Sequence, residues 1–248
     1  MSQYQPRANL LAGKNIMVTG AGSGIGRAAA LAYANFGATV ILLGKTESKL
    51  ESVYDEIEAR GGQQPALVAF DLDHTEPAAY ANIATELGGS FGQLHGLLHN
   101  AGILGQLVPL QQYDAQLFSR VLDVNLLSNF LLTQAMLPAL QAAEHASIVF
   151  TSSSVGRRGR AYWGAYAVAK FGVEGLMQVW ADELESTSKV RVNSLNPCGT
   201  NTPMRRQAYP AEAPGSCPEA DAIMGAYLYL MGDDSLAVNG QALDARPR

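Results

Sequence analysis

Short apolar runs alternate with longer helical segments from residue 15 to residue 192, and this order constrains the fold more than any other feature of the chain. Strands are predicted at 15–19, 39–43, 66–70, 96–98, 147–151 and 191–195, with a seventh near 242–244. Helices are predicted between them at 25–36, 47–60, 77–91, 115–139 and 164–186. Such alternation predicts a doubly wound α/β fold, with a parallel sheet of about seven strands and helices on both faces.

Residues 1–248 are expected to form a single domain, because no repeat, low-complexity tract or linker divides them. The segment 197–218 stands apart, since it is rich in proline, carries both Cys198 and Cys217, and lacks periodicity. A loop of this length inside a compact domain is usually a functional lid or a disordered segment. We therefore expect a substrate flap here.

Composition narrows the function classes. A net charge of −5 gives no general attraction to nucleic acid or to an anionic membrane, and 48% hydrophobic residues suit a buried core. The first fourteen residues lack the pattern of a signal peptide, and no apolar run is long enough to span a bilayer. Two cysteines without an export signal favour a reducing compartment, so a cytoplasmic location is expected.

A glycine-rich turn follows the first strand and leads directly into a helix. Glycines there permit a tight turn and let the backbone approach a pyrophosphate, which rests on the helix N-terminus. A purely structural turn is the alternative, but the position between strand one and helix one of a Rossmann-type domain favours dinucleotide binding. The turn comprises Thr19, Gly20, Ala21, Gly22, Ser23, Gly24, Ile25 and Gly26.

The end of the second strand bears on the choice of cofactor. Enzymes that use NAD usually carry Asp or Glu there for the ribose hydroxyls, whereas this chain has Gly44 followed by Lys45. No carboxylate repels a 2′-phosphate, and a cation can pair with it, so NADP(H) is favoured over NAD(H) and no metal is expected. Alternatively, Lys45 is an ordinary solvated lysine at the start of a helix.

Tyr166 and Lys170 are four residues apart in a predicted helix, which places both on one face. An unperturbed tyrosine titrates near pH ~10, and a neighbouring lysine cation together with a positive nicotinamide would lower its pKa toward a useful value. The pair therefore predicts an acid/base centre at Tyr166, with Lys170 also reaching the cofactor ribose.

The spacing Gly20-xxx-Gly24-x-Gly26 resembles the TGxxxGxG turn of the short-chain dehydrogenase/reductase family, and Tyr166-xxx-Lys170 resembles its YxxxK motif. The resemblance extends from Lys14 to about Asp244. Within the family, the stretches 40–44, 151–157 and 230–234 look most like the bacterial YciK-type oxidoreductases.

The resemblance implies further site residues. Asn125 would hold a water that relays protons to Lys170, and Ser153 would polarise the substrate carbonyl; Asn125 bending a helix and Ser153 capping a strand end are the alternatives. Asp71, which could instead cap a turn, would contact the adenine. Further cofactor contacts are expected at Leu72, Asn100, Ala101, Gly102, Pro197, Gly199, Thr200 and Thr202. The resemblance also implies a homodimer or homotetramer, packed through the helices at 115–139 and 164–186.

The chain departs from the family where Cys198 occupies a position that is usually glycine. If that position requires φ > 0, a cysteine there costs backbone strain. Alternatively, Gly199 takes over the turn. This affects the expected shape of the pocket and not the reaction class. An inert small residue is favoured over a redox sensor at Cys198.

Arginines gather in two loops that should border the site. Arg158 and Arg160 are candidate substrate contacts for an anionic group, together with Ser153 and Tyr166. Arg157, Arg205 and Arg206 belong to the same clusters. Solvated arginines, or arginines paired with acids, are the alternative. Tyr162 and Trp163 would line an apolar wall or pack in the core.

These features together predict an oxidoreductase that transfers a hydride between NADP(H) and a small carbonyl or alcohol substrate, with neither nucleic acid nor membrane as partner. A non-enzymatic NADP(H)-binding sensor or interaction protein is the main alternative. An epimerase or dehydratase with a tightly held cofactor is a second one on the same fold.

Overall fold

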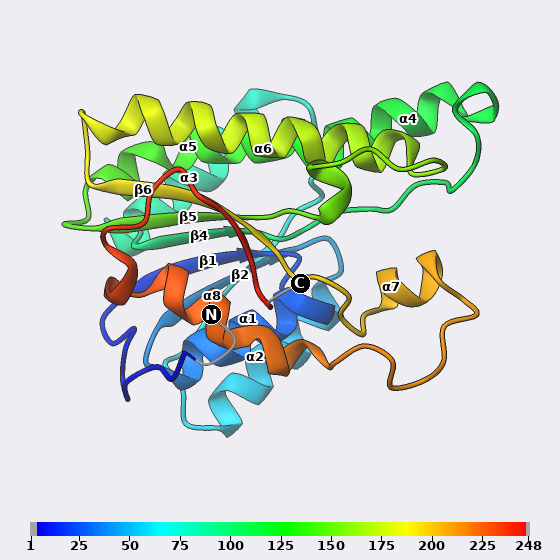
Figure 1. Ribbon diagram of the computed structural model, residues 1–248. Helices are drawn as coiled ribbons and strands as arrows, with labels where there is room; N and C mark the ends of the chain where they lie inside the picture. The colour runs from blue at the N-terminus through cyan, green and yellow to red at the C-terminus, as the bar shows by residue number, and fades with distance from the viewer. Residues whose placement is uncertain (1–3, 247–248) are drawn as a thin grey trace.

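A single seven-stranded parallel sheet organises the chain, in a computed structural model that describes residues 4–246 (Figure 1). The strand order is β3-β2-β1-β4-β5-β6-β7. The strands are β1 (Asn15–Thr19), β2 (Thr39–Gly44), β3 (Ala66–Ala69), β4 (Gly96–His99), β5 (Ala146–Thr151), β6 (Val190–Asn196) and β7 (Ala242–Asp244). The predicted fold class is therefore confirmed, and every predicted strand is present within one residue at each end.

The longer helices also follow the predicted order. They are α1 (Gly24–Asn35), α2 (Glu47–Ala59), α3 (Pro77–Phe91), α4 (Ala115–Leu122), α5 (Ser128–Gln141), α6 (Gly164–Glu185), α7 (Pro203–Ala208) and α8 (Met224–Met231). The helix predicted at 115–139 is interrupted by a π-helical turn, Asp123–Leu127. Short 3-10 turns occur at Leu110–Gln112, Ser154–Gly156, Ala220–Ile223 and Asp233–Ser235. The sequence did not predict α8 or α7.

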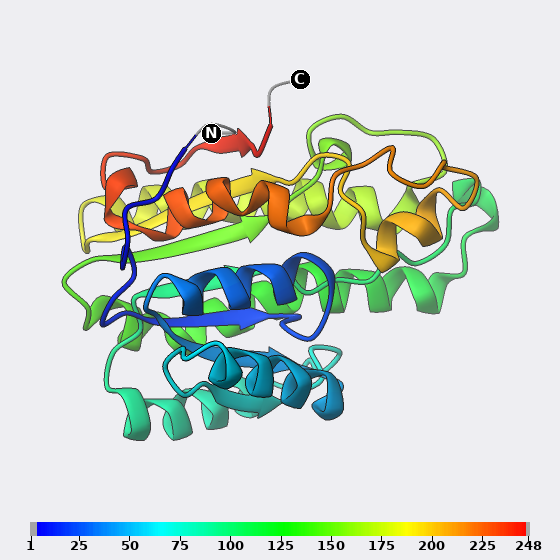
Figure 2. The same cartoon turned by 90° about the horizontal axis from the view of Figure 1, so that it is seen from below.

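Helices cover both faces of the sheet, as Figures 1 and 2 show. On one face α1, α2 and α8 pack into a single apolar cluster with residues of the strands. On the other face α3, α5 and α6 contribute to a second cluster. The five inner strands are almost fully buried between these layers, which explains why they read as continuous apolar runs rather than alternating ones, whereas the edge strands β3 and β7 are partly exposed.

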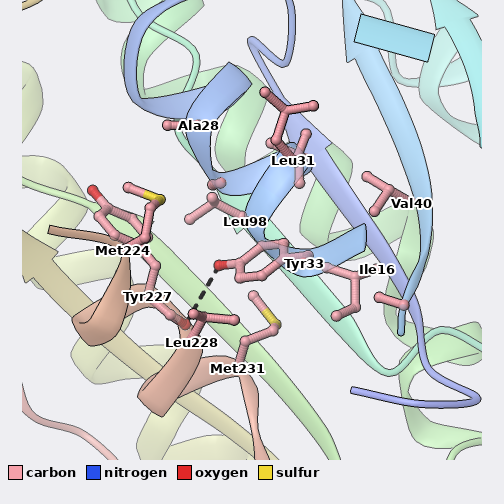
Figure 3. Packing of buried hydrophobic residues seen from close by; sticks show 14 of the residues in the cluster. Ile16, Ala28, Leu31, Tyr33, Val40, Leu98, Met224, Tyr227, Leu228 and Met231 are labelled. Atoms are coloured by element: carbon pink, nitrogen blue, oxygen red, sulfur yellow. Dashed lines mark hydrogen bonds between the residues drawn. The ribbon is translucent and has the colours of Figure 1, made fainter. Parts of the chain in front are cut away.

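The cluster beneath α1 and α8 joins distant parts of the chain (Figure 3). Tyr33 of α1 and Tyr227 of α8 are both fully buried, and the Tyr33 hydroxyl lies 3.5 Å from the carbonyl oxygen of Tyr227. Ile16 and Leu98 pack into the same cluster from neighbouring strands. This packing joins α1 to α8 and holds the glycine turn, which lies between β1 and α1, in place.

Because all seven strands are parallel, their carboxyl ends meet at one edge of the sheet. The strand order reverses between β1 and β4, and in open α/β sheets such a switch point is where ligands bind. The segment 197–218, which contains α7, lies beyond this edge, outside both helical layers (Figure 1). Within residues 4–246, none of the helices combines the length and hydropathy needed to cross a membrane.

Candidate functional site

The glycine turn between β1 and α1 is shaped to receive a ligand backbone. Gly20 has φ +66° and Gly24 has φ +53°, conformations that L side chains rarely adopt. A Cβ at Gly26 would collide with the carbonyl of Gly20 and the carboxamide of Asn100, so α1 packs directly on the turn. Ser23 is the N-cap residue of α1, but its side chain accepts no hydrogen bond from the first N–H groups of that helix. Those groups face the cavity described below and suit a pyrophosphate.

Thr19 supports the turn from behind. Its Oγ1 accepts hydrogen bonds from the backbone nitrogens of Asn100 (2.9 Å) and Ala101 (3.0 Å) and donates one to the carbonyl of Leu98 (3.2 Å). The side chain is fully buried, so these contacts tie the end of β1 to the end of β4. Thr19 thus holds the loop that carries Asn100, Ala101 and Gly102.

The end of β2 carries an ion pair. Lys45 Nζ lies 2.6 Å from Asp71 Oδ2, which follows β3. Partial burial raises the pKa of the Asp71 carboxyl, but hydrogen bonds from Lys45 and from the backbone of Asp73 outweigh it, so the pKa lies below its usual value. The two residues predicted to contact the adenosine half of the cofactor therefore lie side by side.

Sequence reasoning missed a second cation near this position. Lys49, exposed in the first turn of α2, packs its Cβ against the glycine turn, where a Cβ on Gly22 would come within 2.8 Å of it. The sequence did contain a sign of it, because Lys49 follows Lys45 by four residues and lies in the first turn of the next helix.

A cavity of about 660 Å³ opens at the carboxyl ends of the strands. Its lining includes these predicted residues: Gly20, Ser23, Gly24, Ile25, Asn100, Ala101, Gly102, Ser153, Tyr166, Lys170, Pro197, Thr200 and Thr202. Other predicted residues lie outside the lining: Thr19, Gly22, Gly26, Gly44, Lys45, Asp71, Leu72, Asn125, Arg158, Arg160 and Gly199. One cavity thus brings the glycine turn together with Ser153, Tyr166 and Lys170.

Tyr166 lies in the first turn of α6 with 8% of its surface exposed, beside Ser153 at the end of β5. Burial raises the pKa of Tyr166 to about 12, and a hydrogen bond with the Ser153 side chain only partly offsets this. The phenol is therefore protonated at neutral pH. It is a proton donor poised next to a second hydroxyl.

Lys170 lies one turn further along α6 and is also buried. Its Nζ donates a hydrogen bond to the carbonyl oxygen of Thr151 (2.7 Å) and lies 5.6 Å from the centre of the Tyr166 ring. Burial lowers the pKa of Lys170 to about 8, while the charge of Glu174 raises it. The ammonium is thus still mostly protonated at pH 7.

Asn125 lies in the π-helical turn between α4 and α5 and is fully buried. Its Oδ1 accepts from the nitrogen of Ile103 and its Nδ2 donates to the carbonyl of Ile103, both at 2.8 Å. Carbonyls loosened by the wide turn are satisfied by side chains, since Ser128 donates to Val124 and Asn129 to Asn125. Asn125 thus fixes the loop at Ile103, and its predicted water relay stays a prediction.

Glu174, one turn beyond Lys170, was not predicted as part of the site. Its carboxylate accepts hydrogen bonds from Ser152 (2.6 Å), Ser194 (2.6 Å) and Arg157 (3.1 Å). These partners lie directly after β5, in β6 and in the loop after Ser153, so one buried carboxylate joins three elements behind the site. The spacing Tyr166, Lys170, Glu174 places all three on one helical face, which was the available signal.

Cys198 adopts φ +63°, so the cysteine itself takes the left-handed conformation and Gly199 does not take over the turn. It lies in the cavity lining, with its Sγ 3.8 Å from the carbonyl oxygen of Asn196. The same segment then passes close to the glycine turn: a Cβ built on Gly24 would lie 3.4 Å from Cγ2 of Thr202.

Most of the loop arginines already have partners. Arg157 binds Glu174 and Asp244, Arg205 binds Glu212, and Arg206 donates to Asn201. Arg160 donates from Nη1 to the Tyr209 hydroxyl (2.7 Å). The geometry therefore lends no support to direct substrate contact by Arg158 or Arg160, which remains a prediction.

Within residues 4–246, no group of three or more His, Cys, Asp or Glu side chains is placed so that it could hold a metal ion. The polar groups of the cavity include the hydroxyls of Ser153 and Tyr166, the amine of Lys170 and the backbone N–H groups of the glycine turn. Such a set can bind a dinucleotide, donate a proton to a carbonyl oxygen and stabilise the charge that develops.

Comparison with known proteins gives consistent matches over nearly the whole chain. A family model described as short chain dehydrogenase matches residues 14–213. The uncharacterized oxidoreductase YciK of Escherichia coli strain K12 is 47% identical over 244 residues, which cover 98% of this chain and 96% of YciK.

Solved structures agree closely with the fold. A short chain dehydrogenase from Pseudomonas syringae superimposes with a TM-score of 0.97 at 52% identity, covering 98% of this chain and 99% of that one. A short chain dehydrogenase from Escherichia coli CFT073, solved in complex with NADPH, gives a TM-score of 0.95 at 47% identity, covering 98% and 100%.

Proposed function

This chain belongs to the short-chain dehydrogenase family and is an NAD(P)-dependent oxidoreductase, and from that premise we propose that it reduces a carbonyl substrate with NADPH, using Tyr166 as proton donor. The observation that carries the proposal is the shared cavity, in which Ser153, Tyr166 and Lys170 face the glycine turn.

Two features support NADP(H) as the cofactor. Lys45 and Lys49 stand beside the glycine turn where a ribose 2′-phosphate would lie, and Gly44 presents no carboxylate to repel it. A relative of 47% identity was solved in complex with NADPH. We propose that the N-terminus of α1 binds the pyrophosphate and that Lys170 binds the nicotinamide ribose.

The chemistry follows from the protonation states of this chain's own groups. Bound NADPH would supply the hydride to the carbonyl carbon. Tyr166 would donate its proton to the carbonyl oxygen, because a pKa of about 12 keeps the phenol protonated at neutral pH. Ser153 would donate a hydrogen bond to the same oxygen as its negative charge develops.

Lys170 would stabilise the phenolate that forms on Tyr166, since its ammonium is held near the ring by the carbonyl of Thr151. Asn125 would hold in place the loop at Ile103, which lines the cavity. We propose that the 197–218 segment acts as the flap over bound substrate, because nine of the lining residues, from Cys198 to Tyr209, come from it.

We further propose that copies of the chain associate through α6. Val168, Phe171 and Val179 are each about half exposed on this helix. Their spacing puts them on one face with Gly175 between them, which leaves a flat apolar strip.

Both cysteines are free thiols, which supports a location in the reducing cytoplasm.

The first test is titration of the purified protein with NADPH and separately with NADH, followed by nicotinamide fluorescence, and then an NADPH oxidation assay with 2,3-butanedione as a small reactive carbonyl. We expect tight NADPH binding, weaker NADH binding and measurable reduction. Tighter binding of NADH would contradict the role given to Lys45 and Lys49. Binding of NADPH without reduction of any carbonyl would favour the non-enzymatic sensor.

A further inference from the structure

The far end of the cavity, beyond Ser153 and Tyr166, is apolar. Leu104, Val155, Tyr166 and Ala167 form a small buried cluster of their own, separate from the two main clusters of the domain. Leu107, Trp163, Met204 and Ala208 pack against it. Five members of this group also line the cavity: Leu104, Trp163, Tyr166, Met204 and Ala208. The wall that a substrate would meet next to the proton donor is therefore made of hydrocarbon and aromatic rings.

Trp163 forms the corner of that wall. Its ring centre lies 5.7 Å from that of Tyr166 and 6.0 Å from that of Tyr209, which follows α7. Its backbone accepts a hydrogen bond from Ala167, so the indole is anchored to the helix that carries Tyr166. Gly164 fits against the ring of Tyr113, where a Cβ would come within 2.7 Å of it. The indole thus stands at a fixed place beside the reacting group.

The two arginines that line the cavity are paired with carboxylates, and Arg160, 5.9 Å from the Trp163 ring centre, donates to the Tyr209 hydroxyl. Arg120 and Arg205 are the two arginines in the lining formed by the described residues. Arg120 Nε donates to Asp73 (2.7 Å), and Arg205 donates to Glu212 (2.8 and 2.5 Å). The guanidinium of Arg205 also stacks 3.8 Å from the centre of the Tyr209 ring. An anionic substrate group would have to break such pairs, whereas an apolar ring would leave them intact.

From these observations, and resting on the proposed function, we propose that the substrates are uncharged carbonyl compounds whose carbonyl is carried by an apolar ring, with Trp163 as the residue that determines this specificity. The ring of the substrate contacts the indole while its carbonyl oxygen lies between Ser153 and Tyr166. Leu104 and Met204 complete the apolar surroundings.

The test compares kcat/KM at saturating NADPH for a ketone pair of similar shape, 4-isopropylacetophenone and 4-acetylbenzoate, with 2,3-butanedione as the small reference. We expect the uncharged aryl ketone to exceed the carboxylate by at least about tenfold. Trp163→Ala should lower kcat/KM for the aryl ketone by roughly ten- to a hundredfold and change that for 2,3-butanedione by less than about threefold. Trp163→Phe should retain most of the preference. Trp180→Phe, the same change on α6 outside the cavity lining, is the matched control.

A binding measurement separates this inference from the proposed reaction. The Tyr166→Phe variant loaded with NADPH should bind 4-isopropylacetophenone in calorimetry and reject 4-acetylbenzoate, whether or not the wild-type protein turns either over. Equal or better binding of the carboxylate, or an equal loss for all three carbonyls in Trp163→Ala, would overturn the inference. Selective binding of the aryl ketone without turnover in the wild-type protein would uphold it and contradict the proposed reaction instead.

Discussion

The ammonium nitrogen of Lys170 lies 5.6 Å from the centre of the Tyr166 ring, and the carbonyl of Thr151 fixes it there at 2.7 Å. Both side chains are buried on one face of α6. Because burial disfavours the charged form of each, it moves the two pKa values in opposite directions, up to about 12 for Tyr166 and down to about 8 for Lys170.

Removing the phenol should abolish most turnover and spare cofactor binding. We expect Tyr166→Phe to change the NADPH dissociation constant by less than about threefold and to lower kcat by about 10²- to 10⁴-fold, since only the proton donor is lost. Tyr162→Phe removes an exposed hydroxyl from the loop before α6 and should leave both quantities unchanged. Turnover near the wild-type rate in Tyr166→Phe would exclude Tyr166 as the acid.

The lowered pKa of Lys170 should appear in the pH dependence of stability. The unfolded chain holds this proton up to about pH 10.5, whereas the folded protein releases it near pH 8, so between these values the unfolded state binds more protons. The free energy of unfolding should therefore rise with pH in that window. Relative to Lys170→Met, the wild type should gain up to about 1.4 kcal/mol per pH unit in urea unfolding from pH 8.5 to 9.5. Parallel curves for the two proteins would show that the pKa is not lowered.

Cofactor choice should depend on the two lysines beside the glycine turn. Lys45→Ala and Lys49→Ala are each expected to weaken NADPH binding by about tenfold and NADH binding by less than twofold, because only NADPH carries the 2′-phosphate. Lys189→Ala removes an exposed lysine at the opposite end of the sheet and serves as control. An equal loss for NADH and NADPH would place the phosphate elsewhere.

The left-handed backbone at Cys198 should be measurable as strain. Cys198→Gly and Cys198→Ala both remove the thiol, but only glycine adopts φ +63° without a penalty. We expect the glycine variant to be more stable than the alanine variant by about 1 kcal/mol in chemical denaturation. Equal stabilities would mean that this loop relaxes around the alanine.

The Arg160–Tyr209 hydrogen bond links the loop after β5 to the 197–218 segment. Tyr209→Phe removes the hydroxyl, so amide hydrogen exchange in this segment should become severalfold faster, and activity towards bulky ketones should change with it. Tyr54→Phe removes an equally exposed hydrogen bond to Gln64 far from the site and should leave the segment's exchange unaltered. Unchanged exchange in Tyr209→Phe would show that other contacts hold the segment.

The sequence predicted the sheet well because buried parallel strands are short apolar runs between turn residues. The same logic failed for α8, whose eight residues Met224–Met231 are nearly all buried or apolar and show no helical periodicity. The π-helical turn at Asp123–Leu127 was also missed, since its Asn125 pairs with Ile103, a tertiary contact that local sequence does not show. The family resemblance, drawn from two short motifs, is confirmed by the comparisons.

Parts of the site depended on burial, which local sequence does not reveal. The motif led to the expectation that Lys170 and a positive nicotinamide would lower the pKa of Tyr166, yet in the protein itself burial prevails and raises it. The positive φ of Cys198 was left open, because Gly199 next to it offered another residue for the turn. The partners of Arg157 and Arg205 were not, because Glu174, Asp244 and Glu212 meet them only in the folded chain.

The carboxylate of Glu174 divides the site, in the engineering sense, into a frame and a replaceable lining. It links the segment after β5, which carries Ser153, to α6, which carries Lys170, while Leu104 comes from the loop after β4 and Met204 and Tyr209 come from the 197–218 segment. Substitutions in those loops can therefore retune the substrate range without moving the acid. The same frame can serve as a scaffold for redesigned reductases, in which Glu174 stays unchanged together with Ser153, Tyr166 and Lys170.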